Sequence, residues 1–334
     1  MNKEFAFAVL LLAFVFSGAF LVHRSVTYAP KISDFDLTAT AVQNLPEAAQ
    51  SNPIKLVFVG DIMLSRTIGK IMIKNNDWNY PFLLVSDLLK NADITFGNLE
   101  GPISSRGVLS GSIYSFRVDP HAVEGLTASG FDVLSIANNH MWDYGAQAFK
   151  DTLSILASSS ISYVGGGLSY TEAHTPVIKD VRGTKIAYLA YTNLLPASLG
   201  TLGEKPKVAF PDKDQMTSDV KKAKESADIV VVSFHFGDEY KTHHNAYQEK
   251  MAHAAIDAGA SLVIGHHPHV VQDTEQYNGG YIAYSLGNFV FDQNFSKDTR
   301  SGMVVSVSIK DKKIDEFLTQ KVQFNSSFQP YLSD

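Results

Sequence analysis

"IKLVFVGD", residues 54–61, is an apolar stretch that ends in a glycine and an aspartate. It shows no alternation of apolar and polar side chains, which is typical of a strand buried on both faces of a sheet. Five later stretches have the same form: "ADITFGNLE" (92–100), "FDVLSIANNH" (131–140), "ADIVVVSFHFGD" (227–238), "ASLVIGHHPH" (260–269) and "YIAYSLGNFVFD" (281–292). Together the six stretches predict a sheet whose strands are covered on both sides.

Segments with apolar residues at helical spacing lie between several of these strands. They cover residues 80–92, 119–130, 144–159 and 245–260. Strands that alternate with helices indicate an α/β fold with layers, in which the sheet lies in the middle. The chain after about residue 280 is rich in strands without clear helices, so we expect that end of the sheet to be antiparallel.

The composition is that of a well-packed globular protein. The chain has 334 residues, of which 45% are hydrophobic, so a full core does not depend on disulfides or a structural metal. The net charge is −6 and no long basic run occurs, which argues against nucleic acid as the main partner. There is no cysteine, which excludes disulfides, thiolate metal sites and a cysteine nucleophile.

The N-terminus predicts the compartment. Residues 5–22 carry no charge, and their length is close to that of a membrane-spanning helix. An uncleaved membrane anchor is favoured, and the alternative is a cleavable signal peptide, because Ser17, Gly18 and Ala19 offer small residues at a plausible cleavage site. Both alternatives place the rest of the chain at the cell membrane or beyond it, outside the cytoplasm.

The remaining chain divides into three parts. Residues 23–52 lack a sustained period and predict a flexible linker. Residues 53–326 are expected to form one domain, followed by a C-terminal tail at residues 327–334. No internal repeat or second domain is evident.

Polar side chains stand where the predicted strands end. In α/β sheets the loops beyond the carboxyl ends of strands bind ligands, so we expect these side chains to lie close together. They are Asp61, Asn98, Glu100, Asn139, His140, His235, His266, His267 and His269. Taken singly, several of these residues could be turn or capping residues. As an ordered set of oxygen and imidazole groups they suit one or two divalent ions such as Mn, Zn or Fe, and a carboxylate between two ions is how a hydrolytic two-metal site is built.

Six motifs resemble those of a known family. They are "VGDIMLSR", "GNLEGPIS", "ANNHMWDYG", "FHFGDEY", "IGHHPHVVQ" and "YSLGNFVFDQ", and they span about residues 54–295. In this order they resemble the CapA-type bacterial capsule synthesis proteins, a family linked to poly-γ-glutamate and a branch of the calcineurin-like metallophosphoesterase superfamily. The resemblance implies a four-layer α/β/β/α sandwich and an N-terminal membrane anchor.

The resemblance also implies roles for the polar residues. Asp61 and His269 would bind the first metal, and Glu100 would stand between the two ions. The second metal would be bound by Asn139, His235 and His267, with His140 as general acid or stabiliser of developing charge. Arg66, Asn98 and His266 are candidates to contact substrate.

The chain departs from the superfamily pattern at two positions. Met63 stands where an imidazole is usual, and a thioether is a poor ligand for a hard divalent ion. Glu100 stands where the superfamily has an aspartate. A mononuclear site is therefore an alternative to a binuclear one.

Two functions remain open from the sequence. The first is a metal-dependent hydrolase or transferase that acts on an anionic polymer such as poly-γ-glutamate, or on a phosphorylated envelope precursor. The second is a non-catalytic accessory protein that binds polymer or a membrane synthase during synthesis and export. The nearly complete set of ligands slightly favours the hydrolase.

Overall fold

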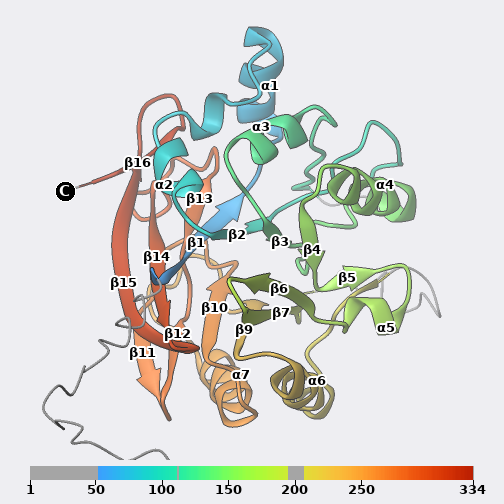
Figure 1. Cartoon of the computed structure of the whole chain (residues 1–334). Coiled ribbons are helices and arrows are strands. Elements are labelled where there is room, and N and C mark those ends of the chain that lie inside the picture. Colours follow the sequence, from blue (N-terminus) through green and yellow to red (C-terminus); the bar gives the residue numbers. More distant parts are fainter. Residues whose placement is uncertain (1–51, 111–112, 195–206, 334) are drawn as a thin grey trace, which may run out of the picture. The chain divides into compact units, whose positions relative to one another are not determined.

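The computed structural model describes residues 52–110, 113–194 and 207–333. Two β-sheets pack face to face between two sets of helices (Figure 1). Within these residues no helix is both long and apolar enough to cross a membrane. The predicted anchor or signal segment at residues 5–22 and most of the predicted linker at 23–52 lie outside the described part of the chain.

The first sheet joins the strands from the two ends of the domain. Its strand order is β16-β15-β14-β1-β2-β3-β4, and β13 also pairs with β1. β1 to β4 run parallel, whereas β14, β15 and β16 form the antiparallel end expected from the sequence. The strands are β1 (Ile54–Ile62), β2 (Ile94–Leu99), β3 (Val133–Ser135), β4 (Ser162–Val164), β13 (Asn288–Val290), β14 (Ser301–Lys310), β15 (Lys313–Phe324) and β16 (Pro330–Leu332).

The second sheet has the order β11-β12-β10-β9-β7-β6. Its central strands β7, β9, β10 and β12 are parallel, and β6 and β11 pair antiparallel at its edges. The strands are β6 (Val177–Val181), β7 (Thr184–Thr192), β9 (Ile229–His235), β10 (Leu262–His266), β11 (Thr274–Tyr277) and β12 (Gly280–Ala283). A separate two-stranded pair consists of β5 (Gly166–Gly167) and β8 (Lys207–Val208).

The helices cover the outer face of each sheet. The first sheet packs against α1 (Arg66–Asn75), α2 (Ser86–Lys90), α3 (Ala122–Ala128) and α4 (Gly145–Ser158), together with the 3-10 turn η1 (Tyr80–Phe82). The second sheet packs against α6 (Lys213–Ser226) and α7 (Ala246–Asp257), and the short helix α5 (Tyr170–Ala173) lies beside β5. Figure 1 shows α6 and α7 on the side of the second sheet that faces away from the first.

The absence of alternation in the strand sequences is explained by these layers. In β1, Leu56 and Phe58 face the core between the two sheets, while Val57 and Val59 face the helices. Every second side chain of a strand points to the opposite face, so a strand covered on both faces needs apolar residues at all positions. The predicted α/β sandwich is therefore confirmed.

Two local features differ from the sequence-based prediction. The single helix expected over residues 80–92 is divided into η1 and α2, because Val85 lies between them with non-helical angles. The segment that the sequence sets apart as a tail, residues 327–334, contributes β16 to the first sheet through pairing with Val322, Gln323 and Phe324. The backbone of that segment thus finds its hydrogen bonds in β15.

Candidate metal centre

The two sheets bring their polar strand ends to one place. β1 and β2 are parallel neighbours in which Asp61 is opposite Asn98, and Glu100 follows directly after β2. In the second sheet His235, the last residue of β9, is opposite His266, the last residue of β10. Parallel strands align their carboxyl ends, so the pairing registers gather these side chains within each sheet, and the packing of the sheets brings the two groups together.

Glu100 occupies the middle of this group. Its side chain is 0% exposed, and neither carboxylate oxygen has a hydrogen-bond partner among the described residues. Oε1 lies 3.5 Å from His235 Nε2 and 3.9 Å from His269 Nε2. Buried carboxylates are normally hydrogen-bonded, paired with a charge or bound to a metal. Bare oxygens that face imidazole nitrogens therefore fit a cation ligand.

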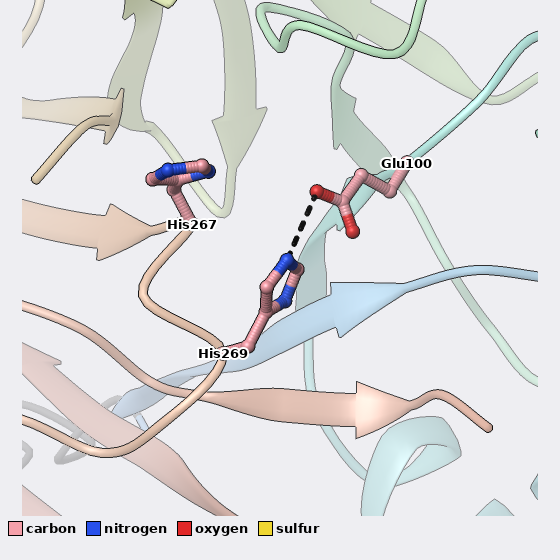
Figure 2. Close-up of side chains that lie close together, drawn as sticks. All are labelled: Glu100, His267 and His269. Carbon is pink, nitrogen blue, oxygen red and sulfur yellow. Dashed lines mark ion pairs between the residues drawn. The ribbon is translucent and has the colours of Figure 1, made fainter. Parts of the chain in front are cut away.

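The loop after β10 supplies two histidines to Glu100. Figure 2 shows His267 and His269 on this loop, with Glu100 opposite and the contact to His269 dashed. One ligand atom from each of the three residues lies within 4.8 Å of the others, and all three residues are buried. His267 and His269 have φ angles of 98° and 57°, a strained region for residues other than glycine. This geometry can hold a metal ion.

Asp61 anchors the first half of the site. Its Oδ1 accepts a hydrogen bond from Asn98 Nδ2 at 2.9 Å, and its Oδ2 accepts one from the backbone N–H of His267 at 3.3 Å. His269 Nδ1 lies 3.3 Å from Asp61 Oδ2 and 3.0 Å from Asn288 Oδ1. Asp61, Glu100 and His269 thus form the group that the family resemblance implies for a first ion.

The second half of the site contains the remaining predicted ligands. His235 Nε2 lies 2.8 Å from Asn139 Oδ1, and the His235 and His267 rings have centroids 4.9 Å apart. Glu100 Oε1 also faces His235, so the structure gathers Asn139, His235 and His267 close to Glu100. These three residues are the ones that the family resemblance implies for a second ion.

Three of the candidate ligands have pKa values that favour the form that binds metal. Burial lowers the pKa of His267 to about 3, and burial also holds the pKa of His235 well below its usual range. Burial opposes ionisation of Asp61, but contacts with His266 and His269 outweigh it and keep the pKa of Asp61 well below normal. Neutral imidazole and ionised carboxylate are the forms that bind metal. These three residues therefore have the protonation states of ligands at neutral pH.

The pair formed by Glu100 and His269 retains at least one proton at neutral pH in the metal-free protein. Burial, which the charge of His269 only partly offsets, holds the pKa of the Glu100 carboxyl well above its usual range. For His269, burial disfavours the imidazolium, but the charges of Glu100 and Asp61 outweigh it and raise the pKa of His269 to about 9. A metal ion that binds to Glu100 and His269 must therefore displace a proton from this pair.

We therefore expect metal binding to release at least one proton at pH 7. The pKa of His269 in the folded protein lies above pH 7, so the apparent affinity should rise by about tenfold per pH unit and level off near pH 9. The folding stability of the metal-free protein should change with pH in the opposite direction to the metal affinity. The stability due to protonated His269 is complete below its unfolded pKa of about 6.5 and is lost as the pH rises through about 9.

Isothermal titration calorimetry in two buffers with different ionisation enthalpies measures this proton release. The His253→Ala variant is a control, because His253 contacts Glu275 on another part of the second sheet. An affinity that does not change between pH 6 and pH 9 would contradict the assigned role of His269.

His140 lies beside the ligands and is held by a carboxylate. Its Nδ1 is 2.8 Å from Asp143 Oδ2, and its ring packs on Phe116 with centroids 4.1 Å apart. Asp143 Oδ2 also accepts the backbone N–H of Phe116 at 2.7 Å. Because Nδ1 is bound to Asp143, Nε2 is the nitrogen of His140 that can exchange a proton with another molecule.

Two of the residues expected to contact substrate support the ligands instead. Asn98 is fully buried, donates to Asp61, lies 3.2 Å from His235 Nδ1 and accepts a hydrogen bond from Asn138 Nδ2 at 3.1 Å. His266 is 0% exposed, and its Nδ1 lies 3.3 Å from Asp61 Oδ1. Both side chains lie behind Asp61, because their positions at strand ends point them into the layer between the sheets.

Arg66 and Met63 border the site in different ways. Arg66 Nη2 contacts Asp292 Oδ1 at 3.3 Å, its Cζ lies 5.8 Å from the Phe116 ring centroid, and its side chain is 40% exposed. Arg66 thus remains a candidate for an anionic substrate. Met63 packs with Phe116 and Phe291, and its Sδ accepts a hydrogen bond from Ser65 Oγ at 3.0 Å. The thioether therefore packs in an apolar cluster and accepts a hydrogen bond from a serine.

The sequence-based interpretation missed two residues that orient ligands or the acid. Asp143 holds His140, and Asn288 holds His269. Both lie in motifs that were recognised, "ANNHMWDYG" and "YSLGNFVFDQ". The three-residue spacing from His140 to Asp143 was a usable signal, whereas the pairing of β13 with β1 places Asn288 and could not be inferred locally.

The chain is similar in sequence to known proteins. The family model described as "Bacterial capsule synthesis protein PGA_cap" matches residues 55–293. The capsule biosynthesis protein CapA of Bacillus anthracis is 33% identical over 325 residues, which cover 93% of this chain and 79% of that protein. The PGA biosynthesis protein CapA of Bacillus subtilis (strain 168) is 35% identical over 263 residues, covering 78% of this chain and 69% of that protein.

A solved structure shares the fold. The crystal structure of a hypothetical protein from Thermus thermophilus superposes with a TM-score of 0.50 at 16% sequence identity. The match covers 84% of this chain and 99% of that chain. At this identity the likeness extends to the fold alone.

Proposed function

We propose, from the premise that this chain belongs to the bacterial capsule synthesis protein family, that it is a metal-dependent hydrolase or transferase of capsule synthesis. Its substrate would be an anionic polymer such as poly-γ-glutamate or a phosphorylated envelope precursor. The observation that carries the proposal is Glu100, a buried carboxylate whose oxygens have no hydrogen-bond partner within the described structure and whose Oε1 faces His235 and His269 at strand ends of the second sheet.

The residues of the site would have separate roles in binding metal and in positioning the ligands. A bound Mn, Zn or Fe ion would supply charge stabilisation and activation of water. Asp61, Glu100 and His269 would hold one ion, and Asn139, His235 and His267 would hold another or the only one. The buried Asn98 keeps Asp61 and His235 in place through its amide.

His140 would serve as the general acid. Asp143 fixes its ring through Nδ1 and leaves Nε2 to donate a proton to the oxygen of the leaving group. Arg66 would pair with a carboxylate or phosphate of the substrate, since its planar fork suits either anion. Phe116 packs on the ring of His140.

We also propose that residues 5–22 anchor the protein in the cell membrane, with the domain outside the cytoplasm. The absence of charge in this stretch supports the proposal. Protease treatment of intact protoplasts tests it: the domain should be digested while a cytoplasmic marker survives, and a domain that is protected until lysis would refute the orientation.

A non-catalytic accessory role is the second candidate. It is supported by Met63, which lies within an apolar cluster where the superfamily has an imidazole ligand, so a first ion would have one ligand fewer. In that case the domain would bind polymer or a membrane synthase. A pull-down from membranes should then recover a synthase even with the His267→Ala variant.

Turnover by the metal-loaded full chain decides between the two candidates. The probes are poly-γ-glutamate, followed by its chain length, and p-nitrophenyl methyl phosphate, followed by release of nitrophenol. We expect turnover of at least one probe by the wild type and its loss in the His267→Ala variant. Absence of turnover of both probes by protein that contains metal would exclude this hydrolase and leave the accessory role.

A further inference from the structure

Two aromatic side chains stand exposed beside the metal centre. Tyr240 is 42% exposed and Phe295 is 63% exposed, and their rings form an edge-to-face pair with centroids 5.1 Å apart. The Tyr240 ring lies 6.3 Å from the ring of His269. Large exposed aromatic groups next to a site often mark where a ligand binds.

Hydrogen bonds to residues next to the candidate ligands hold Tyr240 in place. Its backbone N–H donates to the carbonyl of Pro268, between the two histidine ligands, at 2.8 Å. Its hydroxyl accepts a hydrogen bond from Gln293, and Gln293 in turn accepts one from Asn288, the partner of His269. The φ angle of Tyr240 is 63°, a conformation that costs energy for this residue type. The strained backbone holds an apolar ring at the mouth of the site.

A second apolar edge lies on the side of His140. Val108 is 82% exposed and Leu109 is 51% exposed. The Val108 N–H donates to the Tyr144 carbonyl at 3.2 Å, one residue after Asp143, so this edge is tied to the segment that holds His140. We name Val108, Leu109, Tyr240 and Phe295 the apolar rim.

The layer beneath the rim is also apolar, with one cation beside it. Phe116 and Phe291 pack together with Met63, and they contact His140 and His269 respectively at centroid distances of 4.1 Å and 4.8 Å. Arg66 extends over Phe116 with an exposed guanidinium. Partial burial, and next the charge of Glu239, raises the pKa of Tyr240 to about 12, so its phenol is uncharged near neutral pH. The mouth therefore combines the Arg66 guanidinium, which pairs with Asp292, the candidate metal ligands, the apolar rim and the nearby carboxylate of Glu239.

We infer that the substrate is an amphiphile, an anionic group joined directly to a hydrocarbon segment that packs on the apolar rim. The inference rests on the proposed function and names the class of its substrate. A purely hydrophilic polyanion would leave Tyr240 and Phe295 in water, whereas a hydrocarbon next to the reacting anion would bury them. Arg66 and the metal centre would receive the anion, and the rim would receive the hydrocarbon.

The test compares two monoesters with the same charge, methyl phosphate and n-butyl phosphate. Isothermal titration calorimetry measures their affinities for the metal-loaded full chain in lipid nanodiscs. We expect n-butyl phosphate to bind about tenfold more tightly, since three methylene groups would be partly buried. The double variant Tyr240→Asn with Phe295→Ser should lose this advantage and keep the affinity for methyl phosphate. Asn tolerates the left-handed backbone at position 240.

Leu318→Ala is the matched control, because Leu318 is 58% exposed on β15 and belongs to no part of the rim. It should keep the preference for n-butyl phosphate. Equal affinities in the wild type, or a preference that survives in the double variant, would overturn the inference while turnover of p-nitrophenyl methyl phosphate still supported the proposed function. Failure to bind either ester, together with no turnover, would overturn both. The inference would also be overturned if the wild type bound phosphatidylcholine vesicles through the rim and showed no preference between the esters. The rim would then be a surface that contacts the membrane.

Discussion

The Glu100→Gln variant should lose metal affinity by about a hundredfold or more. Changes in groups that only orient ligands already cost about 10- to 100-fold, and Glu100 is the carboxylate of the first sheet that faces His235 and His269 of the second. A neutral amide of the same shape cannot supply the negative charge. Competition with a fluorescent chelator measures the affinity.

The same substitution should leave the metal-free protein at least as stable as the wild type. Glu100 is completely buried with no hydrogen bond to the described residues, and its raised pKa shows that its charge is disfavoured there. An acid whose folded pKa is raised loses stability as the pH rises above its unfolded pKa, and glutamine removes that loss. Thermal unfolding of chelator-treated protein at pH 7 and pH 9 measures the difference, which should grow with pH.

Glu275→Gln is the control for both measurements. Glu275 is a carboxylate of the second sheet that pairs with His253 and accepts a hydrogen bond from Tyr284. It should keep metal affinity and lose a little stability. If Glu100→Gln retained full metal affinity, Glu100 would not be a ligand and the centre would have to be rebuilt around other residues.

The His140→Ala variant should show a large loss of turnover. General acid catalysis contributes about 10²- to 10⁴-fold to turnover, so kcat should fall by that factor. The metal content should stay unchanged, because His140 pairs with Asp143 and is not one of the implied ligands. Initial rates with p-nitrophenyl methyl phosphate and elemental analysis of the same sample separate the two properties.

Asp143→Asn provides the conservative comparison for His140. The amide keeps the shape but loses the charge that fixes the ring, so kcat should fall less than in His140→Ala. His253→Ala, which disrupts a histidine–carboxylate pair on another part of the surface, should leave kcat unchanged. Loss of metal in His140→Ala would instead make His140 a ligand, and unchanged turnover would refute its role as acid.

The layers and the location of the site could be predicted because they depend on local patterns. The uninterrupted apolar strands, such as residues 54–60, indicate burial on both faces. Polar residues directly after them must gather where parallel strands end, as Asp61 and Asn98 do. The match to the capsule synthesis family confirms the resemblance that the six motifs suggested.

The surroundings of individual side chains could not be predicted, because they depend on packing between distant segments. Nothing local distinguishes His266, whose Nδ1 lies 3.3 Å from Asp61 Oδ1, from the adjacent His267, which forms the candidate ligand group with Glu100 and His269. The difference arises because β10 ends at His266 and the loop begins after it. The support of His269 by Asn288 depends on the pairing of β13 with β1, two strands from opposite ends of the domain sequence.

Elemental analysis of the full chain, purified from cells grown with ample metal, tests the central claim most directly. We expect at least one Mn, Zn or Fe ion per chain in the wild type, and its loss in the His267→Ala variant, because His267 offers a neutral imidazole to the centre. Wild-type protein that contains no such ion under these conditions, and takes up none when titrated, would contradict the assignment of Glu100, His267 and His269 as a metal centre.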